Sequence, residues 1–348
     1  MSALLESLRK PFIINFEITS QCNQECTFCS AQLSKYHRED LPTERVLEII
    51  SKIASEDICS IFLTGGEPFL RRDLPLIVRE CIGHGMNVSL STNGTGASSE
   101  IAEEIRSAGL KEIQVSIHAP DETHDRIVGV QGAALRSFSG LRNLIEAGLG
   151  VTVAAVATRT NCSLLPELAQ KIAKMGAKHF RVLRLMPHSH ETLRQIVPRM
   201  EMQVLVKRLR QLEKELQEFT IEIHTSPGFL DTSASELREY SILHPLCHTC
   251  TAGKLSMAIL SDGNCVPCLE LKDPKFECGN VLRDPLAEIW RAKPMSLLRS
   301  VTPHRYHGKC GDCELKWTCY SARCVSYNLG GDLLGNDESC YRLLSNAD

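Results

Sequence analysis

The sequence predicts an α/β fold, a partial (β/α)6 barrel of the TIM type, followed by a small cysteine-rich domain. Short apolar runs alternate with amphipathic helical stretches over the first two thirds of the chain, which is typical of a parallel sheet built from βαβ units. Runs such as VTVAAV at 151–156 are apolar at successive positions, as expected of strands buried on both faces. Ten of the sixteen cysteines then lie between Cys247 and Cys340, where the alternation stops.

Six runs of β-branched and apolar residues are the predicted strands: Ile13–Thr19, Ser60–Leu63, Asn87–Ser91, Glu112–Ile117, Val151–Ala157 and His179–Leu185. Apolar residues at helical spacing predict the helices between them, one around 46–53 and others at Ser98–Ser107, Ala133–Ala147 and Leu164–Met175. An open doubly wound sheet also fits this alternation. The barrel is favoured because polar motifs directly follow several strands, and the carboxyl ends of strands form the usual active face of such barrels.

The remaining third is predicted to contain a charged helix over 203–219, a further strand at Ile221–His224 and a linker over 226–246. Two apolar runs around Asp262-Gly263, Leu255–Leu260 and Asn264–Pro267, predict a hairpin. We therefore expect two domains, residues 1–240 and residues 241–348.

Composition excludes several classes of protein. The chain has 348 residues and a net charge of −3, which gives no reason to expect a nucleic-acid partner. Its apolar runs are too short to span a membrane, and Met1–Lys10 lacks the apolar core of a signal peptide. We expect a cytoplasmic protein, in which thiols stay reduced and many cysteines indicate metal or redox chemistry.

Three cysteines, Cys22, Cys26 and Cys29, follow the first predicted strand with the spacing Cys-x3-Cys-x2-Cys. A zinc knuckle that lacks its fourth ligand and ordinary buried cysteines are two interpretations. An iron–sulfur cluster is the third. Such clusters are normally held by four cysteines, so three thiolates would leave one iron open to another ligand.

Further motifs follow the next strands: Gly65-Gly66-Glu67-Pro68 after the second, Thr92-Asn93-Gly94 after the third, and Ser116 at the end of the fourth. Together with the triad and the aromatic Phe28 before its third cysteine, they resemble the radical S-adenosylmethionine (radical SAM) superfamily across residues 13 to 190. Taken singly, each of the later motifs is more often an ordinary turn or strand end.

The resemblance implies that the triad holds a [4Fe–4S] cluster and that S-adenosylmethionine binds its open iron. It implies that Glu67 and the neighbouring backbone hold the methionine amino group, with glycines allowing close approach to the ligand. It also implies that Thr92, Asn93 and Ser116 lie near the ribose or carboxylate. One departure is Val128, which stands where many relatives have an arginine. Arg126 and Arg184 are the candidates to replace that contact.

The C-terminal cysteines resemble the SPASM extension of radical SAM enzymes, which carries two auxiliary [4Fe–4S] clusters. The resemblance assigns Cys250, Cys268 and Cys324 to the first auxiliary cluster, with Cys247 as the expected fourth ligand. It assigns four others to the second cluster: Cys310, Cys313, Cys319 and Cys340. The spacing Cys319-x4-Cys324 is one residue longer than is typical.

A zinc site competes with this assignment, because Cys247-x2-Cys250-x14-Cys265-x2-Cys268 is close to zinc-ribbon spacing. Cys265 is also an alternative to Cys268 as a cluster ligand. Cys59, Cys81 and Cys162 lie in apolar contexts and are expected in the core. Cys278 receives no role.

Other polar residues are weaker candidates. His188 and His190 follow the sixth strand and are candidates to line a substrate pocket. His118 and His124 are expected to be structural or polar pocket residues. Glu17 lies on the first strand, where a carboxylate pointing into the barrel would need a partner.

The resemblance implies an enzyme that forms a 5′-deoxyadenosyl radical and removes hydrogen from a peptide or protein side chain, with the auxiliary clusters taking up an electron. Its expected partners are an electron donor such as flavodoxin or ferredoxin and a separate peptide-recognition protein. A dehydrogenase, epimerase or decarboxylase acting on a small molecule, such as an aminosugar or a tetrapyrrole, is the first alternative. A non-catalytic zinc-binding interaction protein is the second, and it leaves the N-terminal motifs unexplained. The sequence names no catalytic acid or base.

Overall fold

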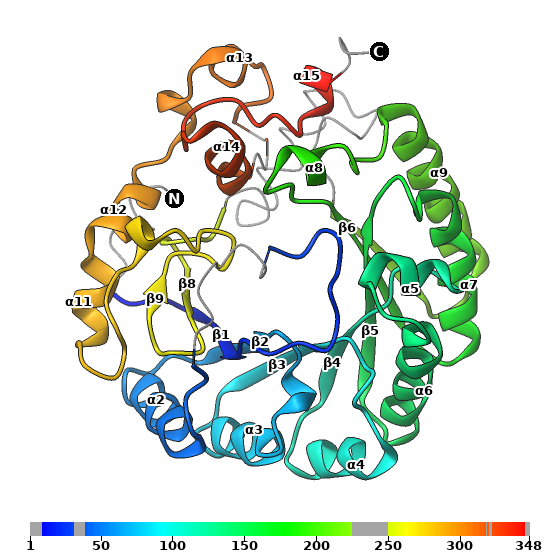
Figure 1. The fold of residues 1–348 in the computed structure, drawn as a ribbon, viewed down its shortest axis with the longest axis horizontal. Coiled ribbons are helices and arrows are strands. Elements are labelled where there is room, and N and C mark those ends of the chain that lie inside the picture. Colours follow the sequence, from blue (N-terminus) through cyan, green and yellow to red (C-terminus); the bar gives the residue numbers. More distant parts are fainter. Residues whose placement is uncertain (1–8, 31–38, 225–249, 318, 320–321, 345–348) are drawn as a thin grey trace.

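The computed structural model describes residues 9–30, 39–224, 250–317, 319 and 322–344. Its centre is one curved nine-stranded sheet with the order β7-β6-β5-β4-β3-β2-β1-β8-β9 (Figure 1). The first seven strands are β1 (Ile13–Thr19), β2 (Ser60–Gly65), β3 (Asn87–Thr92), β4 (Glu112–Ser116), β5 (Gly150–Ala157), β6 (His179–Arg184) and β7 (Thr220–His224). They pair in parallel, each with the next along the chain, so the expected α/β architecture is confirmed.

Helices cover the outer face of this sheet, and the ends of the strand order do not pair, which makes the barrel partial (Figure 1). These helices are α2 (Thr43–Ser55), α3 (Leu74–Gly83), α4 (Ser99–Ser107), α6 (Ala133–Glu146), α7 (Leu165–Lys174) and α9 (Arg199–Glu215). Two short helices, α5 (Thr123–Val128) and α8 (His190–Leu193), follow β4 and β6. The main core fills the space between the two layers, with Ile14 and Phe16 of β1 and Ile49 and Ile50 of α2 among its buried members. No helix in the described part of the chain is long and apolar enough to cross a membrane.

The predicted strands agree with the observed ones to within two residues at each end, since each is a β-branched run between turn residues. The charged helix begins at Arg199, four residues before the predicted start. Helix α3 was not predicted, because its apolar run LPLIV does not show helical alternation. Cys81 and Cys162 are buried as expected. The prediction for Cys59 was wrong, because this residue is exposed directly before the start of β2.

The C-terminal region adds to the barrel's own sheet. Strand β8 (Ser256–Ile259) pairs in parallel with β1, from Ile13 opposite Ser256 to Phe16 opposite Ile259, and β9 (Cys265–Val266) pairs antiparallel with β8. The predicted hairpin is therefore present, but its attachment to β1 was not predicted. The helices that follow are α11 (Leu286–Arg291), α12 (Lys293–Arg299), α13 (Gly308–Gly311), α14 (Arg323–Gly330) and α15 (Tyr341–Leu344).

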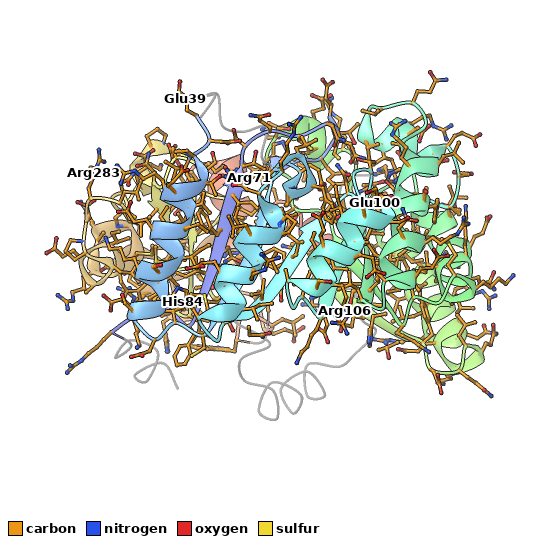
Figure 2. All side chains as sticks on the ribbon, turned by 90° about the horizontal axis from the view of Figure 1, so that it is seen from below. Glu39, Arg71, His84, Glu100, Arg106 and Arg283 are labelled. Atoms are coloured by element: carbon orange, nitrogen blue, oxygen red, sulfur yellow. The ribbon has the colours of Figure 1, made fainter. Side chains whose placement is uncertain are left out.

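The two ends of the barrel are distinguished by the side chains at the helix ends. Figure 2 shows Arg71 at one end of the layer formed by α2, α3 and α4, with His84 and Arg106 at the other. The Arg71 guanidinium donates to the carbonyl of Ile18 at 2.9 Å, near the carboxyl end of β1. The Arg71 end is therefore the face at which the predicted motifs emerge.

Candidate functional site

The cysteine triad lies in the loop that follows β1. Cys26 and Cys29 are half-buried, whereas Cys22 is more exposed. Burial, and then the nearby thiols of Cys29 and Cys22, raises the pKa of the Cys26 thiol to about 12, so the three thiols are close enough to interact. A thiol with so high a pKa is protonated near neutral pH, so binding of a cation at the triad would release protons.

Main-chain hydrogen bonds hold the triad loop against the end of α5. The amide of Glu25 donates to the Val128 carbonyl at 2.9 Å, and the amide of Thr27 donates to the Ile127 carbonyl at 3.0 Å. Gly129 ends α5 with a φ of 71°, a left-handed conformation that favours glycine. A segment far along the chain thus determines the conformation of the triad loop.

Phe28, which directly precedes Cys29, anchors the end of the triad loop by packing against two histidine rings. Its ring meets the His118 ring edge to face with centroids 5.0 Å apart, and His118 stacks on His124. Both imidazoles are buried. Burial, and then the neighbouring His124, lowers the pKa of His118 to about 3, so this ring is neutral at physiological pH. His118 and His124 therefore support the site as packed, uncharged rings.

The two glycines after β2 allow two loops to touch. A Cβ on Gly65 would lie 2.2 Å from the Thr19 carbonyl oxygen, and one on Gly66 would lie 2.0 Å from that of Gln21. The absence of side chains here lets the two loops form main-chain hydrogen bonds. The amide of Gly66 donates to the carbonyl of Thr19 at 2.8 Å, and the amide of Glu67 donates to the carbonyl of Gln21 at 2.7 Å. In the structure these glycines are required by the approach of the triad loop.

Glu67 ties this loop to the one after β3. Its buried carboxylate accepts from the Thr92 hydroxyl and the Asn93 amide, both at 2.6 Å, and from the Phe69 amide at 2.9 Å. Burial raises the pKa of Glu67, although the three donors act in the opposite direction. The Asn93 side chain also donates to Asn23 of the triad loop at 2.8 Å.

The loops after the first three strands therefore form one connected unit. Pro68 begins a short 3-10 helix (Pro68–Leu70) capped by Glu67, and Ser116 lies half-buried at the carboxyl end of β4, beside this unit in strand order. Three thiols beside a glycine-lined loop suit an iron–sulfur cluster and a ligand that carries amino and carboxylate groups.

The two arginine candidates lie apart from this unit. Arg126 is exposed on α5 and donates to the hydroxyl of Thr123 at 2.9 Å. Arg184 has a side chain that is 12% exposed and pairs with the buried Asp337 of the C-terminal region at 3.2 Å. Its charge acts on the thiols of Cys319 and Cys324, so Arg184 belongs to the C-terminal cysteines.

Three C-terminal thiols gather as one set. Burial raises the pKa of Cys324 well above its usual value, and the neighbouring Cys268, the Glu270 carboxyl and Cys250 raise it further. Cys250 also raises the pKa of Cys268, so these two thiols lie near each other as well. Cys247, the expected fourth member, lies outside the described residues.

Four other thiols form a second set. Burial raises the pKa of Cys319 to about 12, with contributions from Cys340, Asp337 and Cys313. Cys340 lies near both Cys310 and Cys313. Among the described cysteines, the neighbours of Cys324 and of Cys319 are thus those that the SPASM resemblance places with each of them.

The zinc-ribbon pairing is divided by the fold. Cys265 is buried in the main core beside Cys278, while Cys268 packs against a second core cluster that contains Leu271 and Leu298. Among the described residues, no three His, Cys, Asp or Glu side chains converge on a point that would hold a single metal ion. The thiolates of a four-iron cluster bind separate irons and stand farther apart than the ligands of one ion.

Besides the pair of Arg184 with Asp337, further polar contacts join the barrel to the C-terminal region. Lys272 and Glu17, each with a side chain only 5% exposed, form an ion pair at 2.6 Å, which supplies the partner expected for Glu17. The hydroxyl of Ser30, next to Cys29, donates to the carboxyl of Glu270 at 2.9 Å. The amide of Glu270 in turn donates to the sulfur of Cys268 at 3.4 Å. Glu270 and Lys272 were not predicted as site residues. The one feature of the sequence that could have pointed to them is that they follow Cys268 closely along the chain.

Comparison with known proteins agrees with this geometry. Residues 16–160 match the model of the radical SAM superfamily, and residues 237–314 match that of an iron–sulfur cluster-binding domain, SPASM. The AdoMet-dependent heme synthase of Methanosarcina barkeri is 27% identical over 341 residues, covering 95% of this chain and 96% of the relative. The PqqA peptide cyclase of Methylobacterium nodulans is 25% identical over 344 residues, covering 98% of this chain and 88% of the relative.

The fold is also found among solved structures. The structure described as native anSMEcpe with bound AdoMet superposes with a TM-score of 0.76 at 17% identity, covering 97% of each chain. At that identity the likeness concerns the fold.

Proposed function

The chain is an enzyme of the radical SAM superfamily with a C-terminal SPASM domain, and we propose that it oxidises a bound substrate through three [4Fe–4S] clusters. S-adenosylmethionine and [4Fe–4S] clusters, including auxiliary clusters of the SPASM domain, are its cofactors. Their number, their ligands and the substrate are parts of the proposal. The observation that carries it is the grouping of the described cysteines into three sets, one after β1 and two in the C-terminal region.

In this proposal Cys22, Cys26 and Cys29 hold the cluster that binds S-adenosylmethionine. When bound, the pair supplies a 5′-deoxyadenosyl radical that takes a hydrogen atom from the substrate. The loops at Gly65–Pro68 and Thr92–Asn93 orient the cosubstrate, together with Ser116. Phe28 and the neutral rings behind it close the site on the side of β4.

The two C-terminal sets hold the auxiliary clusters. Cys250, Cys268 and Cys324, with Cys247, hold the first, and Cys310, Cys313, Cys319 and Cys340 hold the second. The contact from Ser30 through Glu270 to Cys268 supports an arrangement in which the first auxiliary cluster adjoins the triad. When bound by these cysteines, the clusters would supply an acceptor for the electron that the substrate radical must lose, which suits a net oxidation.

A peptide side chain is the proposed substrate, supported by relatives such as the PqqA peptide cyclase. A tetrapyrrole is the second candidate, supported by the heme synthase, whose length this chain covers almost entirely. Equilibrium binding to the loaded enzyme separates them. Binding of a free tetrapyrrole, seen as a shift of its visible absorption band, with no peptide modified would favour the second candidate.

The cluster assignment is tested by anaerobic reconstitution of the full chain. We expect about twelve irons per chain, and about eight in the triple variant Cys22→Ala, Cys26→Ala and Cys29→Ala, which should form no 5′-deoxyadenosine. Cys59→Ala removes an exposed thiol outside the three sets and is the control. Unchanged cleavage of S-adenosylmethionine by the triple variant, or stoichiometric zinc in place of iron, would contradict the proposal.

A further inference from the structure

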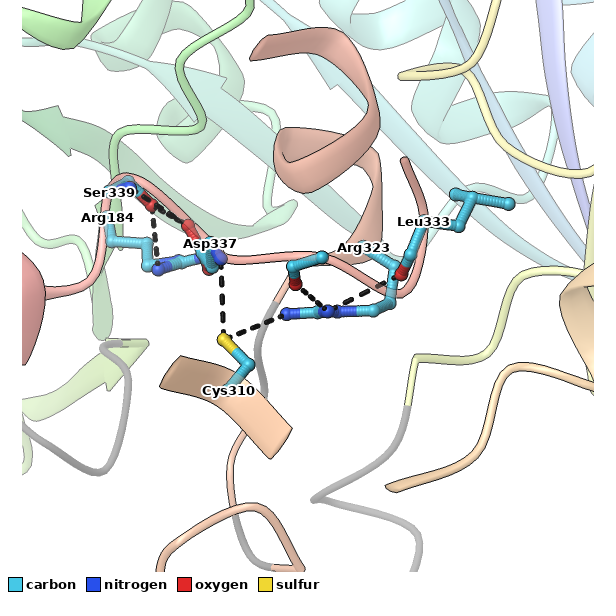
Figure 3. A network of polar contacts seen from close by, with 7 residues as sticks. Arg184, Cys310, Arg323, Leu333, Asp337 and Ser339 are labelled. Carbon is cyan, nitrogen blue, oxygen red and sulfur yellow. Dashed lines mark hydrogen bonds and ion pairs between the residues drawn. The ribbon is translucent and has the colours of Figure 1, made fainter. Parts of the chain in front are cut away.

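A buried arginine contacts the second set of C-terminal thiols. Arg323, 2% exposed, begins α14 directly before Cys324 of the first set. One of its terminal nitrogens donates to the sulfur of Cys310, in the second set, at 3.8 Å (Figure 3). Arg323 therefore lies between the two sets and contacts a thiol of the second.

The guanidinium is held in place by several neighbours. Its other terminal nitrogen donates to the carbonyls of Gly335 at 2.8 Å and Leu333 at 3.4 Å. The Tyr306 ring stacks on the guanidinium at 4.4 Å. These three groups are neutral, whereas the half-exposed carboxyl of Asp332 interacts with the charge of the guanidinium. The thiolates of a bound cluster would add further negative charge beside it, at Cys310.

The sulfur of Cys310 has a second donor. The main-chain amide of Asp337 donates to it at 3.4 Å, as Figure 3 also shows. In the first set, Cys268 accepts from one amide, that of Glu270, and lies beside the carboxyl of the same residue. Charges of both signs lie near both sets: Glu270 and Lys272 near Cys268, and Asp337 and Arg184 near Cys319. What the second set has in addition is the direct contact from the Arg323 guanidinium to the sulfur of Cys310.

We infer that Arg323, through its contact with Cys310, raises the reduction potential of the second auxiliary cluster and so helps that cluster to hold the electron released in the reaction. This inference rests on the proposed cluster ligands. Hydrogen bonds and positive charge at the sulfurs stabilise the reduced, more negative form of an iron–sulfur cluster. Arg323 acts through Cys310 and is a positioning residue.

The redox step balances in this arrangement. After hydrogen abstraction the substrate radical loses one electron to the clusters and one proton to water, and becomes a closed-shell product. The second auxiliary cluster is reduced by that one electron. It then passes the electron to an oxidised protein of the flavodoxin or ferredoxin class.

Potentiometric titration of the loaded full chain, followed by electron paramagnetic resonance, tests the inference. In Arg323→Met we expect a more negative midpoint potential for the second auxiliary cluster. At a fixed potential the ratio of reduced to oxidised cluster should be about tenfold lower, which for one electron is a shift of about 59 mV. Arg323→Lys keeps the charge but loses the planar fork, and should shift the midpoint less. Arg305→Gln removes an exposed arginine of the same region, which donates to the carbonyl and the hydroxyl of Ser300, and should leave the midpoint unchanged.

Three results would contradict the inference or the proposed function. Unchanged midpoints in both Arg323 variants with all clusters loaded would overturn the inference while leaving the proposed function intact. Loss of the second cluster from both variants would also overturn it, since Arg323 would then have a structural role only. A wild-type chain that holds no auxiliary clusters would instead remove the proposed function itself.

Discussion

At the scale of single residues, Glu67 shows how the site is assembled. By resemblance it was expected to hold the methionine amino group. In the structure its carboxylate accepts three hydrogen bonds from the protein, which join the loops after β2 and β3. The residue was predictable from the Gly-Gly-Glu motif, but its partners were not, because they lie on another strand.

Glu67→Gln is predicted to weaken S-adenosylmethionine binding about tenfold, the equivalent of about 1.4 kcal/mol. The amide nitrogen of glutamine cannot accept a hydrogen bond, so at least one buried donor loses its partner, at a cost of about 1–3 kcal/mol. Equilibrium dialysis of the loaded enzyme measures the affinity. Glu80→Gln, on the exposed side of α3, is the control, and equal affinity in both variants would contradict the prediction.

Among the secondary-structure elements, helix α6 packs directly against the loop after β3. A Cβ on Gly140 would lie 1.9 Å from the Gly94 carbonyl oxygen, so the helix and loop are in close contact. The hydroxyl of Ser137 donates to the carbonyl of Asn93 at 2.8 Å from the same helix. Helix α6 itself was predictable from its periodicity. Its contact with the loop was not, because a glycine within a helix pattern does not reveal what approaches it.

Gly140→Ala is expected to push α6 and the Thr92–Gly94 loop apart. Overpacking of this kind costs about 1–3 kcal/mol, and it should lower thermal stability and weaken S-adenosylmethionine binding together. Gly83→Ala is a matched control, since it also lies in a helix and a Cβ there meets nothing within 4 Å. That control should be neutral or stabilising. A Gly140→Ala variant as stable as the control would show that the loop yields without cost.

At the scale of the whole molecule, two connections join the barrel and the C-terminal region. Strand β8 extends the barrel's sheet beside β1, and Lys272 forms a buried ion pair with Glu17 of that strand. The contacts from Ser30 to Glu270 and from Glu270 to Cys268 then bring the sulfur of Cys268 near the triad loop. The relative position of the two regions follows from β1, which takes part in both.

Lys272→Met is predicted to lower the free energy of unfolding by about 3–5 kcal/mol, because it leaves Glu17 buried without its partner. The double variant with Glu17→Gln should recover part of this loss, and chemical denaturation of the four proteins gives the coupling energy. Lys178→Met breaks an exposed pair with Glu218 and should cost about 0–1 kcal/mol. Equal losses from Lys272→Met and Lys178→Met would mean that the buried pair does not join the two regions.

The strands and most helices of the barrel, and the motifs that resemble the radical SAM superfamily, can be predicted from the amino-acid sequence, because they depend on local periodicity and on motif spacing along the chain. The resemblance also implies how the C-terminal cysteines divide into two sets. What lies beside each motif is known from the folded structure alone: Thr92 beside Glu67, Lys272 beside Glu17, and Arg323 beside Cys310. Those partners are distant in sequence, and a hydrogen bond or ion pair between them leaves no periodic pattern that the sequence could show.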